Sequence, residues 1–230
     1  MTTALILGVG GLGCPAALAL AEELPGVRLV LVDPDRVERS NLARQILFTE
    51  NDVGDTKAIV AARRLAALVP DVRAEPRVAA FRSGTAAELL AGCDVVLDGT
   101  DDFETRFLVN DAACAARIPL VHGAVLGWRG QILTVSPRRG PCLRCLFEGP
   151  PPAGAVPTCA EAGVLAPLCG VVGAAMAAEA ARLLRGERPH WSGRLKQWDA
   201  LHDKEREIRV PQRADCPACG LAPSGALRHL

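Results

Sequence analysis

The chain has 230 residues; half are hydrophobic, 23% are charged, and 26 Lys and Arg residues balance 26 Asp and Glu residues. This apolar content excludes an intrinsically disordered chain, because such chains bury too little surface to offset the entropy of ordering. The zero net charge and the 3% aromatic content disfavour a dedicated nucleic-acid binder, which needs phosphate-neutralising cations and stacking rings.

Strands and helices are predicted to alternate through the first half of the chain. Apolar runs that end in turn residues predict buried strands, and longer patterned stretches between them predict helices. Such alternation is typical of an α/β fold, a mostly parallel sheet with helices on both faces. In chain order, strands are expected over 4–8, 28–32, 72–78, 94–97 and from 120 to 122, with helices over 14–24, 57–69, 84–91 and 103–117.

The pattern changes after residue 123 and predicts an antiparallel C-terminal part. In chain order, we expect a strand over 131–136, an irregular proline-rich segment over 150–157, an alanine-rich helix over 168–185 that ends at Gly186, and a strand pair over 193–198 and 207–210. The chain is therefore expected to form a single domain over 1–220. This domain would hold a nucleotide-binding part over about 1–125 and a second part over about 126–220, followed by a tail over 221–230.

Two uncharged segments resemble targeting or membrane sequences. The first 21 residues lack the basic region that precedes the apolar stretch of a secretory signal, and glycines interrupt them. Residues 162–178 consist largely of Ala and Gly and contain Pro167, which favours a buried helix over a membrane span. We therefore expect a cytoplasmic protein with neither a membrane nor a nucleic-acid partner.

A glycine-rich loop lies between the first expected strand and the first expected helix. Residues 8–13 match the pattern G-x-G-x-x-G, and Asp33 lies 20 residues after Gly13. Glycines let the backbone approach a phosphate, the helix N-terminus supplies N–H groups, and the carboxylate accepts ribose hydroxyls. The motif in this context predicts an adenine-nucleotide site on a Rossmann-like sheet, with a purely structural turn as the alternative.

Two cations follow the glycine loop and favour ATP as the nucleotide. Arg44 and Lys57 can neutralise a triphosphate and stabilise departing pyrophosphate, whereas a hydride-transferring enzyme has no evident need of them. Solvated surface charges are the alternative interpretation. In the sequence, the two cations stand behind the loop among Asp33, Asp35, Ser40, Asn41 and Gln45.

Three carboxylates, Asp98, Asp101 and Asp102, follow the fourth expected strand. The carboxyl ends of strands are where open α/β sheets bind ligands, and carboxylates there suit Mg²⁺, which binds one or two of them together with phosphates and water. The alternative is helix capping, because Asp101 or Asp102 stands before the helix expected over 103–117.

Nine cysteines divide into two Cys-x-x-Cys pairs and five single residues. Four thiolates complete a tetrahedral Zn²⁺ site with a structural role, so zinc is expected at Cys142, Cys145, Cys216 and Cys219. A redox role for one pair is the alternative. Cys159 follows the proline-rich segment and is a candidate nucleophile. The remaining residues, Cys14, Cys93, Cys114 and Cys169, are expected to be buried.

Taken in order, these motifs resemble the ThiF/MoeB/HesA proteins, bacterial relatives of ubiquitin-activating enzymes. The resemblance covers about residues 4–220 and rests on the glycine loop, Asp33-x-Asp35, Ser40-Asn41-Leu42-x-Arg44-Gln45, Lys57, Thr100-Asp101 and the two cysteine pairs. It implies a MgATP-dependent adenylyltransferase that activates the C-terminal glycine of a small ubiquitin-like sulfur carrier ending in Gly-Gly, with release of pyrophosphate. The pathway would be thiamine, molybdopterin or related sulfur transfer.

The resemblance also assigns roles to individual residues. Residues 148–163 match the crossover loop under which the carrier's tail passes, and Cys159 matches a cysteine that some members link covalently to the carrier. Arg44, Lys57 and Asp101 would be catalytic, with Asp101 on Mg²⁺. A homodimer and a separate sulfur-donor protein are implied. The full set of expected ATP-site residues is Gly8, Gly10, Gly11, Gly13, Asp33, Asp35, Ser40, Asn41, Arg44, Gln45, Lys57, Asp101 and Asp102.

Two departures from the family pattern keep other functions open. Relatives begin with a helix that carries an Arg-x-x-Arg-Gln element, and one of these arginines reaches ATP in the partner subunit, whereas here the first strand starts almost at Met1. The usual Thr-Asp-Asn reads Thr100-Asp101-Asp102. The alternatives are therefore a weakly catalytic carrier-binding scaffold without the arginine arm, and an NAD-dependent oxidoreductase that rests on the glycine loop alone.

Overall fold

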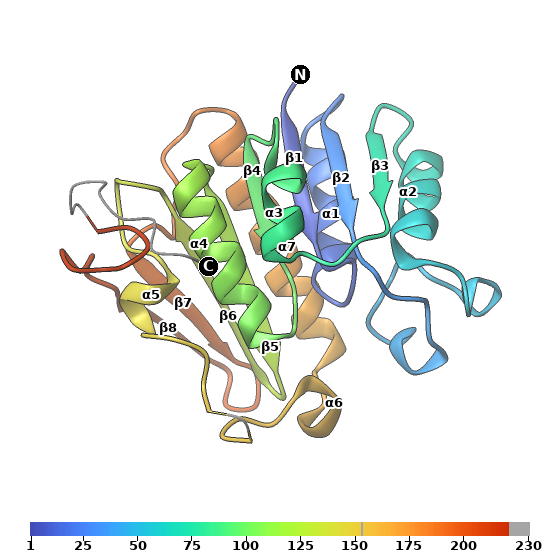
Figure 1. Ribbon diagram of the computed structural model, residues 1–230. Coiled ribbons are helices and arrows are strands. Elements are labelled where there is room, and N and C mark those ends of the chain that lie inside the picture. Colours follow the sequence, from blue (N-terminus) through green and yellow to red (C-terminus); the bar gives the residue numbers. More distant parts are fainter. Residues whose placement is uncertain (153, 221–230) are drawn as a thin grey trace.

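The computed structural model describes residues 1–152 and 154–220, so the expected tail over 221–230 lies outside the described residues. Within them, eight strands form one mixed sheet in the order β3-β2-β1-β4-β5-β6-β7-β8 (Figure 1). The first five strands pair in parallel, and β6, β7 and β8 extend the sheet antiparallel from β5. The predicted fold class is confirmed.

The elements have the following bounds. The strands are β1 (Thr3–Leu7), β2 (Arg28–Val32), β3 (Arg73–Arg77), β4 (Val95–Asp98), β5 (Leu120–Leu126), β6 (Arg129–Val135), β7 (Arg194–Asp199) and β8 (Lys204–Arg209). The helices are α1 (Gly13–Glu23), α2 (Lys57–Leu68), α3 (Ser83–Leu90), α4 (Phe103–Ala116), α5 (Leu143–Leu146), α6 (Cys159–Ala162) and α7 (Ala166–Leu184), with 3-10 turns at Arg39–Asn41 and Glu50–Asp52.

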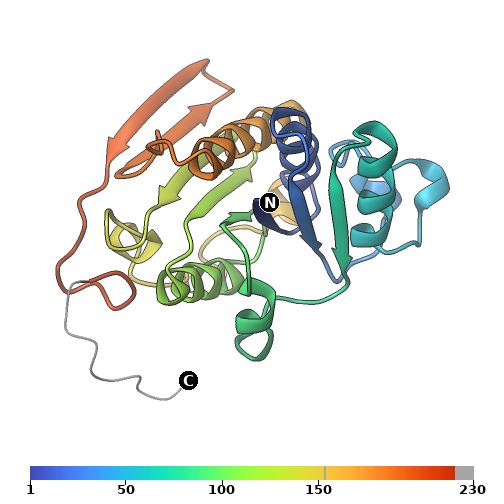
Figure 2. The ribbon, with the colours of Figure 1, turned by 90° about the horizontal axis from the view of Figure 1, so that it is seen from above.

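Side chains of the parallel strands alternate between two cores. In β1, Ala4 and Ile6 face the core that α1, α2 and α7 cover, whereas Leu5 and Leu7 face the core that α3 and α4 cover. Figure 2 shows α7 and α4 on opposite sides of the sheet. Burial on both faces is why β1, β2 and β4 are largely continuous apolar runs, from which they could be predicted.

The long apolar helix α7 packs on α1 and on the middle of the sheet. Its length and composition would allow a membrane span, but buried core helices share these features, and half of its most apolar 18 residues are buried. Glycines bring the layers together, since a Cβ at Gly123 would clash with Met176 and one at Gly173 would clash with Pro15. The helix ends before Gly186, which has a φ of +73°, as predicted for a C-terminal glycine.

The edge strand β8 is longer than predicted, because it begins at Lys204 rather than at residue 207. All six of its residues are exposed, and five of them are charged. An edge strand with charged side chains resists pairing with other chains, but it lacks the apolar alternation that identifies a strand in a sequence.

Candidate functional site

The glycine loop lies at the carboxyl end of β1, between β1 and α1. Gly8 has a φ of +79°, and a Cβ there would lie 3.1 Å from the carbonyl oxygen of Gly99 and 3.2 Å from the nitrogen of Thr100. A Cβ on Gly13 would clash with the carbonyl oxygen of Gly8. Only glycine fits these positions, so the loop packs directly on the segment that follows β4.

Asp33 joins the glycine loop to the end of β2. Its carboxylate is buried and accepts hydrogen bonds from the backbone nitrogens of Val9, at 2.7 Å, and Asp35, at 2.8 Å. Burial raises the pKa of Asp33, while the charge of Lys57 opposes that rise. Each carboxylate oxygen can accept a second hydrogen bond, so a ribose hydroxyl remains a chemically suitable ligand.

Two predicted cations lie near this loop. Lys57 is the first residue of α2, and its Nζ atom lies 3.0 Å from the Asp35 carboxylate. The Lys57 side chain is 9% exposed and that of Asp35 is 64% exposed. The Arg44 guanidinium donates to the Asn41 side chain at 2.6 Å and to the Ser40 carbonyl at 3.2 Å. A Cβ on Gly11 would lie 3.5 Å from the aliphatic stem of Arg44. Thus Arg44 lies beside the glycine loop.

Gln45 provides a test of whether a ligand fits this site. Gln45 is 3% exposed, and its Nε2 atom lies 3.6 Å from the position that a Cβ on Gly10 would take. Among the described residues, its Oε1 atom has no hydrogen-bond partner. A buried acceptor without a partner costs about 1–3 kcal/mol, which a donor on a bound molecule would recover. The residues present therefore fit a polar ligand such as a nucleotide.

Of the three carboxylates that were expected to lie together after β4, Asp98 does not lie with the other two at the surface. Asp98 is fully buried and hydrogen-bonds to His122 and Thr100, because alternation along β4 turns its side chain into the core beneath α4. Asp102 caps α4 by accepting a hydrogen bond from the backbone nitrogen of Thr105 at 2.7 Å. Asp101 is exposed and carries no hydrogen bond among the described residues, so it is the carboxylate best placed to hold Mg²⁺.

We expect replacement of Asp102 by alanine to lower the free energy of unfolding by about 1 kcal/mol, and replacement by asparagine to lower it much less. Burial opposes ionisation, but the hydrogen bonds from Thr105 prevail and lower the pKa of Asp102. The advantage of aspartate over asparagine is therefore present above its ordinary pKa of 3.8 and is lost as the pH falls. Urea denaturation at several pH values checks this. A loss from asparagine at pH 7 as large as that from alanine would contradict capping.

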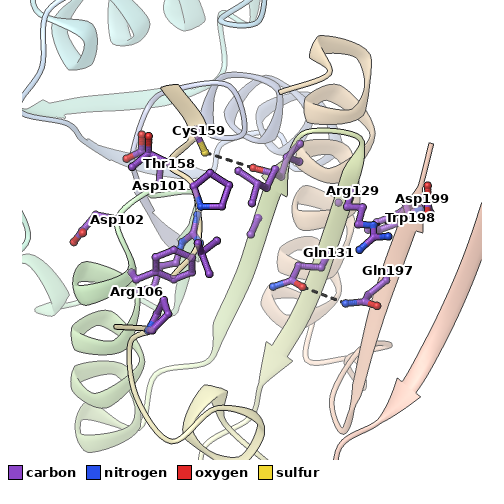
Figure 3. Close-up of a pocket in the computed structure, with 18 of the residues that line it drawn as sticks. Asp101, Asp102, Arg106, Arg129, Gln131, Thr158, Cys159, Gln197, Trp198 and Asp199 are labelled. Atoms are coloured by element: carbon purple, nitrogen blue, oxygen red, sulfur yellow. Dashed lines mark hydrogen bonds and ion pairs between the residues drawn. The ribbon is translucent and has the colours of Figure 1, made fainter. Parts of the chain in front are cut away.

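A groove of 1110 Å³ adjoins Asp101. Its floor is formed by β5, β6 and β7, and the N-terminus of α4 and the proline-rich segment around 150–152 and 154–159 form its walls (Figure 3). Arg106, which sequence reasoning missed, lies here and is only 8% exposed; its Nε atom donates to the carbonyl oxygen of Thr100 at 2.9 Å. A groove of this size and mixed polarity can hold an extended peptide.

Cys159 is the first residue of α6 and lines the groove. Its Sγ atom lies 3.6 Å from the carbonyl oxygen of Val125. Burial raises the pKa of the Cys159 thiol, and the charge of Asp101 adds to that rise, although Arg106 and Arg44 oppose it. The thiol is therefore not activated as a nucleophile in this conformation. The four cysteines expected to be buried, Cys14, Cys93, Cys114 and Cys169, are buried.

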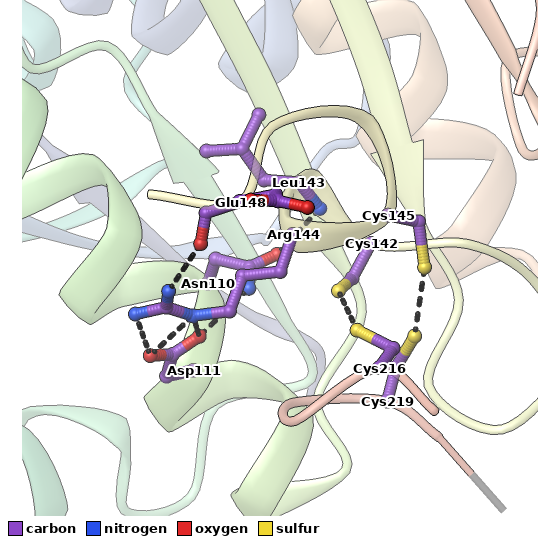
Figure 4. A network of polar contacts seen from close by, with 9 residues as sticks. All are labelled: Asn110, Asp111, Cys142, Leu143, Arg144, Cys145, Glu148, Cys216 and Cys219. Atoms are coloured by element: carbon purple, nitrogen blue, oxygen red, sulfur yellow. Dashed lines mark hydrogen bonds and ion pairs between the residues drawn. The ribbon is translucent and has the colours of Figure 1, made fainter. Parts of the chain in front are cut away.

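The two Cys-x-x-Cys pairs come together at the C-terminal end of the described chain (Figure 4). Cys142 and Cys216 have sulfur atoms 3.6 Å apart, Cys145 and Cys219 have theirs 3.4 Å apart, and all four sulfurs lie within 4.8 Å of one another. A tetrahedral Zn²⁺ with Zn–S bonds of about 2.3 Å separates its sulfurs by about 3.8 Å. The cysteine cluster therefore fits zinc.

The cysteine cluster is supported by α4. The Asn110 side chain accepts a hydrogen bond from the backbone nitrogen of Leu143 at 2.9 Å, and Asp111 forms a bidentate pair with Arg144 at 2.7 Å (Figure 4). Such contacts fix the backbone around the first cysteine pair, as outer residues do at metal centres.

Comparison with known proteins gives a family and named relatives. A family model described as the ThiF family matches residues 1–218. The sulfur carrier protein adenylyltransferase of Thermus thermophilus is 46% identical over 224 residues, which are 95% of this chain and 82% of that protein. The SAMP-activating enzyme E1 of Haloferax volcanii is 46% identical over 215 residues, covering 94% of this chain and 79% of the relative.

Two further comparisons are less complete. The adenylyltransferase and sulfurtransferase MOCS3 of Sus scrofa is 45% identical over 221 residues, but this chain spans only 48% of its length. Among solved structures, E. coli MccB with ATP has a TM-score of 0.83 at 21% identity, over 95% of this chain and 67% of that one. At this identity the likeness shows the fold.

Proposed function

This chain belongs to the ThiF family and is an adenylyltransferase, and we propose that its substrate is the C-terminal glycine carboxylate of a small ubiquitin-like sulfur carrier. One observation carries the proposal: Asp101 lines the peptide-sized groove, and the residue before it packs against the glycine loop. The proposed nucleotide site at the glycine loop and the groove would therefore meet at Asp101. A carrier tail in the groove would place its carboxylate beside the phosphates.

The reaction needs little covalent help from the protein. A carboxylate oxygen of the carrier attacks the α-phosphorus of ATP, a new P–O bond forms, and the bond to the bridging oxygen breaks to release pyrophosphate. The attacking carboxylate is already ionised at neutral pH, so no general base is required. Positioning and charge neutralisation supply the catalysis, and Arg44 and Lys57 are the cations proposed to stabilise the departing pyrophosphate.

Two metals complete the proposal. Mg²⁺, which Asp101 would hold, neutralises phosphate charge when it is bound. Zn²⁺ in the cysteine cluster would be structural, because four thiolates leave no position for water. The finer assignments rest on the family resemblance: sulfur transfer for thiamine, molybdopterin or a related product, a homodimer and a separate sulfur donor. The proposed cytoplasmic location rests on the composition of the two uncharged segments. The oxidoreductase alternative finds no support among the named relatives.

The proposed function predicts carrier-dependent exchange of labelled pyrophosphate into ATP. The protein is assayed with Mg²⁺ and each diglycine-ended carrier from the same genome, and with the same carriers lacking the final glycine. We expect exchange with an intact carrier and none with its truncated form, because the tail that is one residue shorter would hold its terminal carboxylate too far from the α-phosphorus. Binding of ATP and of a carrier without exchange would instead support the scaffold alternative.

A further inference from the structure

A buried Asp–His pair lies beneath the nucleotide site and takes no part in the reaction proposed above. Asp98 is 0% exposed and His122 is 2% exposed, and the His122 Nδ1 atom lies 2.9 Å from the Asp98 Oδ2 atom. An ionised carboxylate can only accept, so Nδ1 carries the proton and donates it. The two residues are register partners on β4 and β5, in the middle of the sheet.

The other oxygen of Asp98 holds the loop that leads to Asp101. Asp98 Oδ1 accepts from the Thr100 hydroxyl at 2.7 Å and from the Thr100 backbone nitrogen at 3.1 Å. Arg106 also holds Thr100, because its Nε atom donates to the carbonyl oxygen of Thr100 at 2.9 Å. All the backbone polar groups of Thr100 are therefore fixed by side chains of β4 and α4.

Fixing this loop also fixes its distance from the glycine loop. Gly99 donates its backbone nitrogen to the carbonyl oxygen of Leu7 at 3.0 Å, and a Cβ on Gly8 would touch the Gly99–Thr100 peptide. The next residue is Asp101, which the proposed function places on the metal and phosphates. A small displacement of Thr100 would therefore move Asp101 relative to the nucleotide.

Stability alone does not account for the pair. Well-packed apolar residues often replace a buried ion pair without loss of stability, and the strand positions around these two residues hold Val96, Leu120 and Leu133. What apolar residues could not provide is an acceptor for Thr100. The ionised carboxylate provides it, and His122 satisfies the remaining oxygen of that carboxylate.

We propose that His122 is a positioning residue that acts through Asp98 and Thr100 to hold Asp101 at the nucleotide. The role of Asp101 rests on the proposed function, whereas the chain of hydrogen bonds from His122 to Thr100 does not. Among the described residues, His122 does not line the groove and its side chain hydrogen-bonds to Asp98, so it acts through the loop and not on the substrate.

Three variants of the full-length protein test this proposal. His122→Leu removes the hydrogen-bond donor to Asp98 and keeps a side chain of similar volume. His122→Asn is the rescue variant, because its amide nitrogen can take the place of Nδ1. Thr134→Val is the matched control. Thr134 lies on β6, and the substitution removes its buried hydrogen bond of 3.0 Å to Glu179 on α7. The readouts are hydrogen exchange at the Thr100 amide, MgATP affinity by calorimetry, and the Mg²⁺ concentration for half-maximal pyrophosphate exchange.

In His122→Leu, we expect the Thr100 amide to exchange about tenfold faster and MgATP affinity to fall about tenfold, with a matching rise in the Mg²⁺ requirement. His122→Asn should stay within about threefold of wild type in each readout. Thr134→Val should lower stability only. If His122→Leu does not fold, Thr100→Val carries the test, because it removes the hydroxyl that Asp98 holds.

Two results would overturn the positioning role. One is a His122→Leu protein in which the hydrogen exchange of the Thr100 amide and the MgATP affinity equal those of the wild type. If His122→Leu does not fold, the same result for the amide of residue 100 in Thr100→Val has this meaning. The other is an equal loss in Thr134→Val, which would show a general effect of stability. The proposed function fails separately: if no carrier supports pyrophosphate exchange by the wild type while the variants change Thr100 exchange and MgATP affinity as expected, the carrier assignment falls and the positioning role stands.

Discussion

Replacement of Lys57 by alanine is expected to lower carrier-dependent pyrophosphate exchange by about 10²–10³-fold, the usual loss when one preorganised charge-stabilising group is removed. The Lys57 side chain is only 9% exposed, so little water screens its charge from a triphosphate near the glycine loop. Its partner Asp35 is largely exposed, so the loss of the ion pair costs little stability. The measurement is the exchange rate of variant and wild type at saturating carrier.

The matched control is Arg63→Ala, which removes a cation from the same helix. Arg63 is 62% exposed and binds Asp52 instead of Asp35. We expect this variant to retain exchange within about threefold of wild type, as surface substitutions usually do. Thermal denaturation of both variants shows whether either has lost its fold. An Lys57→Ala protein that melts normally and exchanges like the control would remove Lys57 from the proposed site.

The parallel half of the fold could be predicted closely from the sequence. The predicted helices and strands up to β4 agree with the observed bounds within a residue, and β2 agrees at both ends. The strands β1, β2 and β4 are largely apolar and buried, and a glycine or an aspartate marks the end of each, so local sequence carries the information, whereas β3 is polar and partly exposed. The short helices α5 and α6 could not be predicted, because four residues contain no periodic pattern.

Parts of the candidate site could be predicted where the spacing of residues in the sequence indicates a binding motif. They could not be predicted where contacts between distant segments determine the position of a side chain. The four cysteines of the two pairs lie together, and Arg44, which was predicted to bind the nucleotide, lies beside the glycine loop. Asp98 was grouped with the surface carboxylates, but its side chain points into the core. That orientation depends on strand alternation and on the contact with His122, which is 24 residues away. One feature of the sequence could have identified Arg106 as a site residue: it lies one helical turn after Asp102, on the helix that begins at the loop.

Loss of zinc from the cysteine cluster is the second large effect that we expect. In the Cys216→Ser variant, the bound zinc should fall from about one ion per chain to near zero. The free energy of unfolding should fall by at least about 3 kcal/mol, because metal binding is coupled to folding. For a chain of this size, that corresponds to a melting temperature lower by about 6–12 °C. Elemental analysis and calorimetry check both values.

The size of this effect follows from what the cluster joins. Cys142 and Cys216 lie on segments 74 residues apart in the chain, and the second segment follows the exposed edge strand β8. Without metal, few buried apolar contacts would hold that segment, so it should detach and expose the core beside α4. Cys93→Ser is the matched control, because Cys93 is also buried but lies outside the cluster. A wild type without zinc, or equal losses of stability in the two variants, would contradict a structural metal and return the redox alternative to consideration.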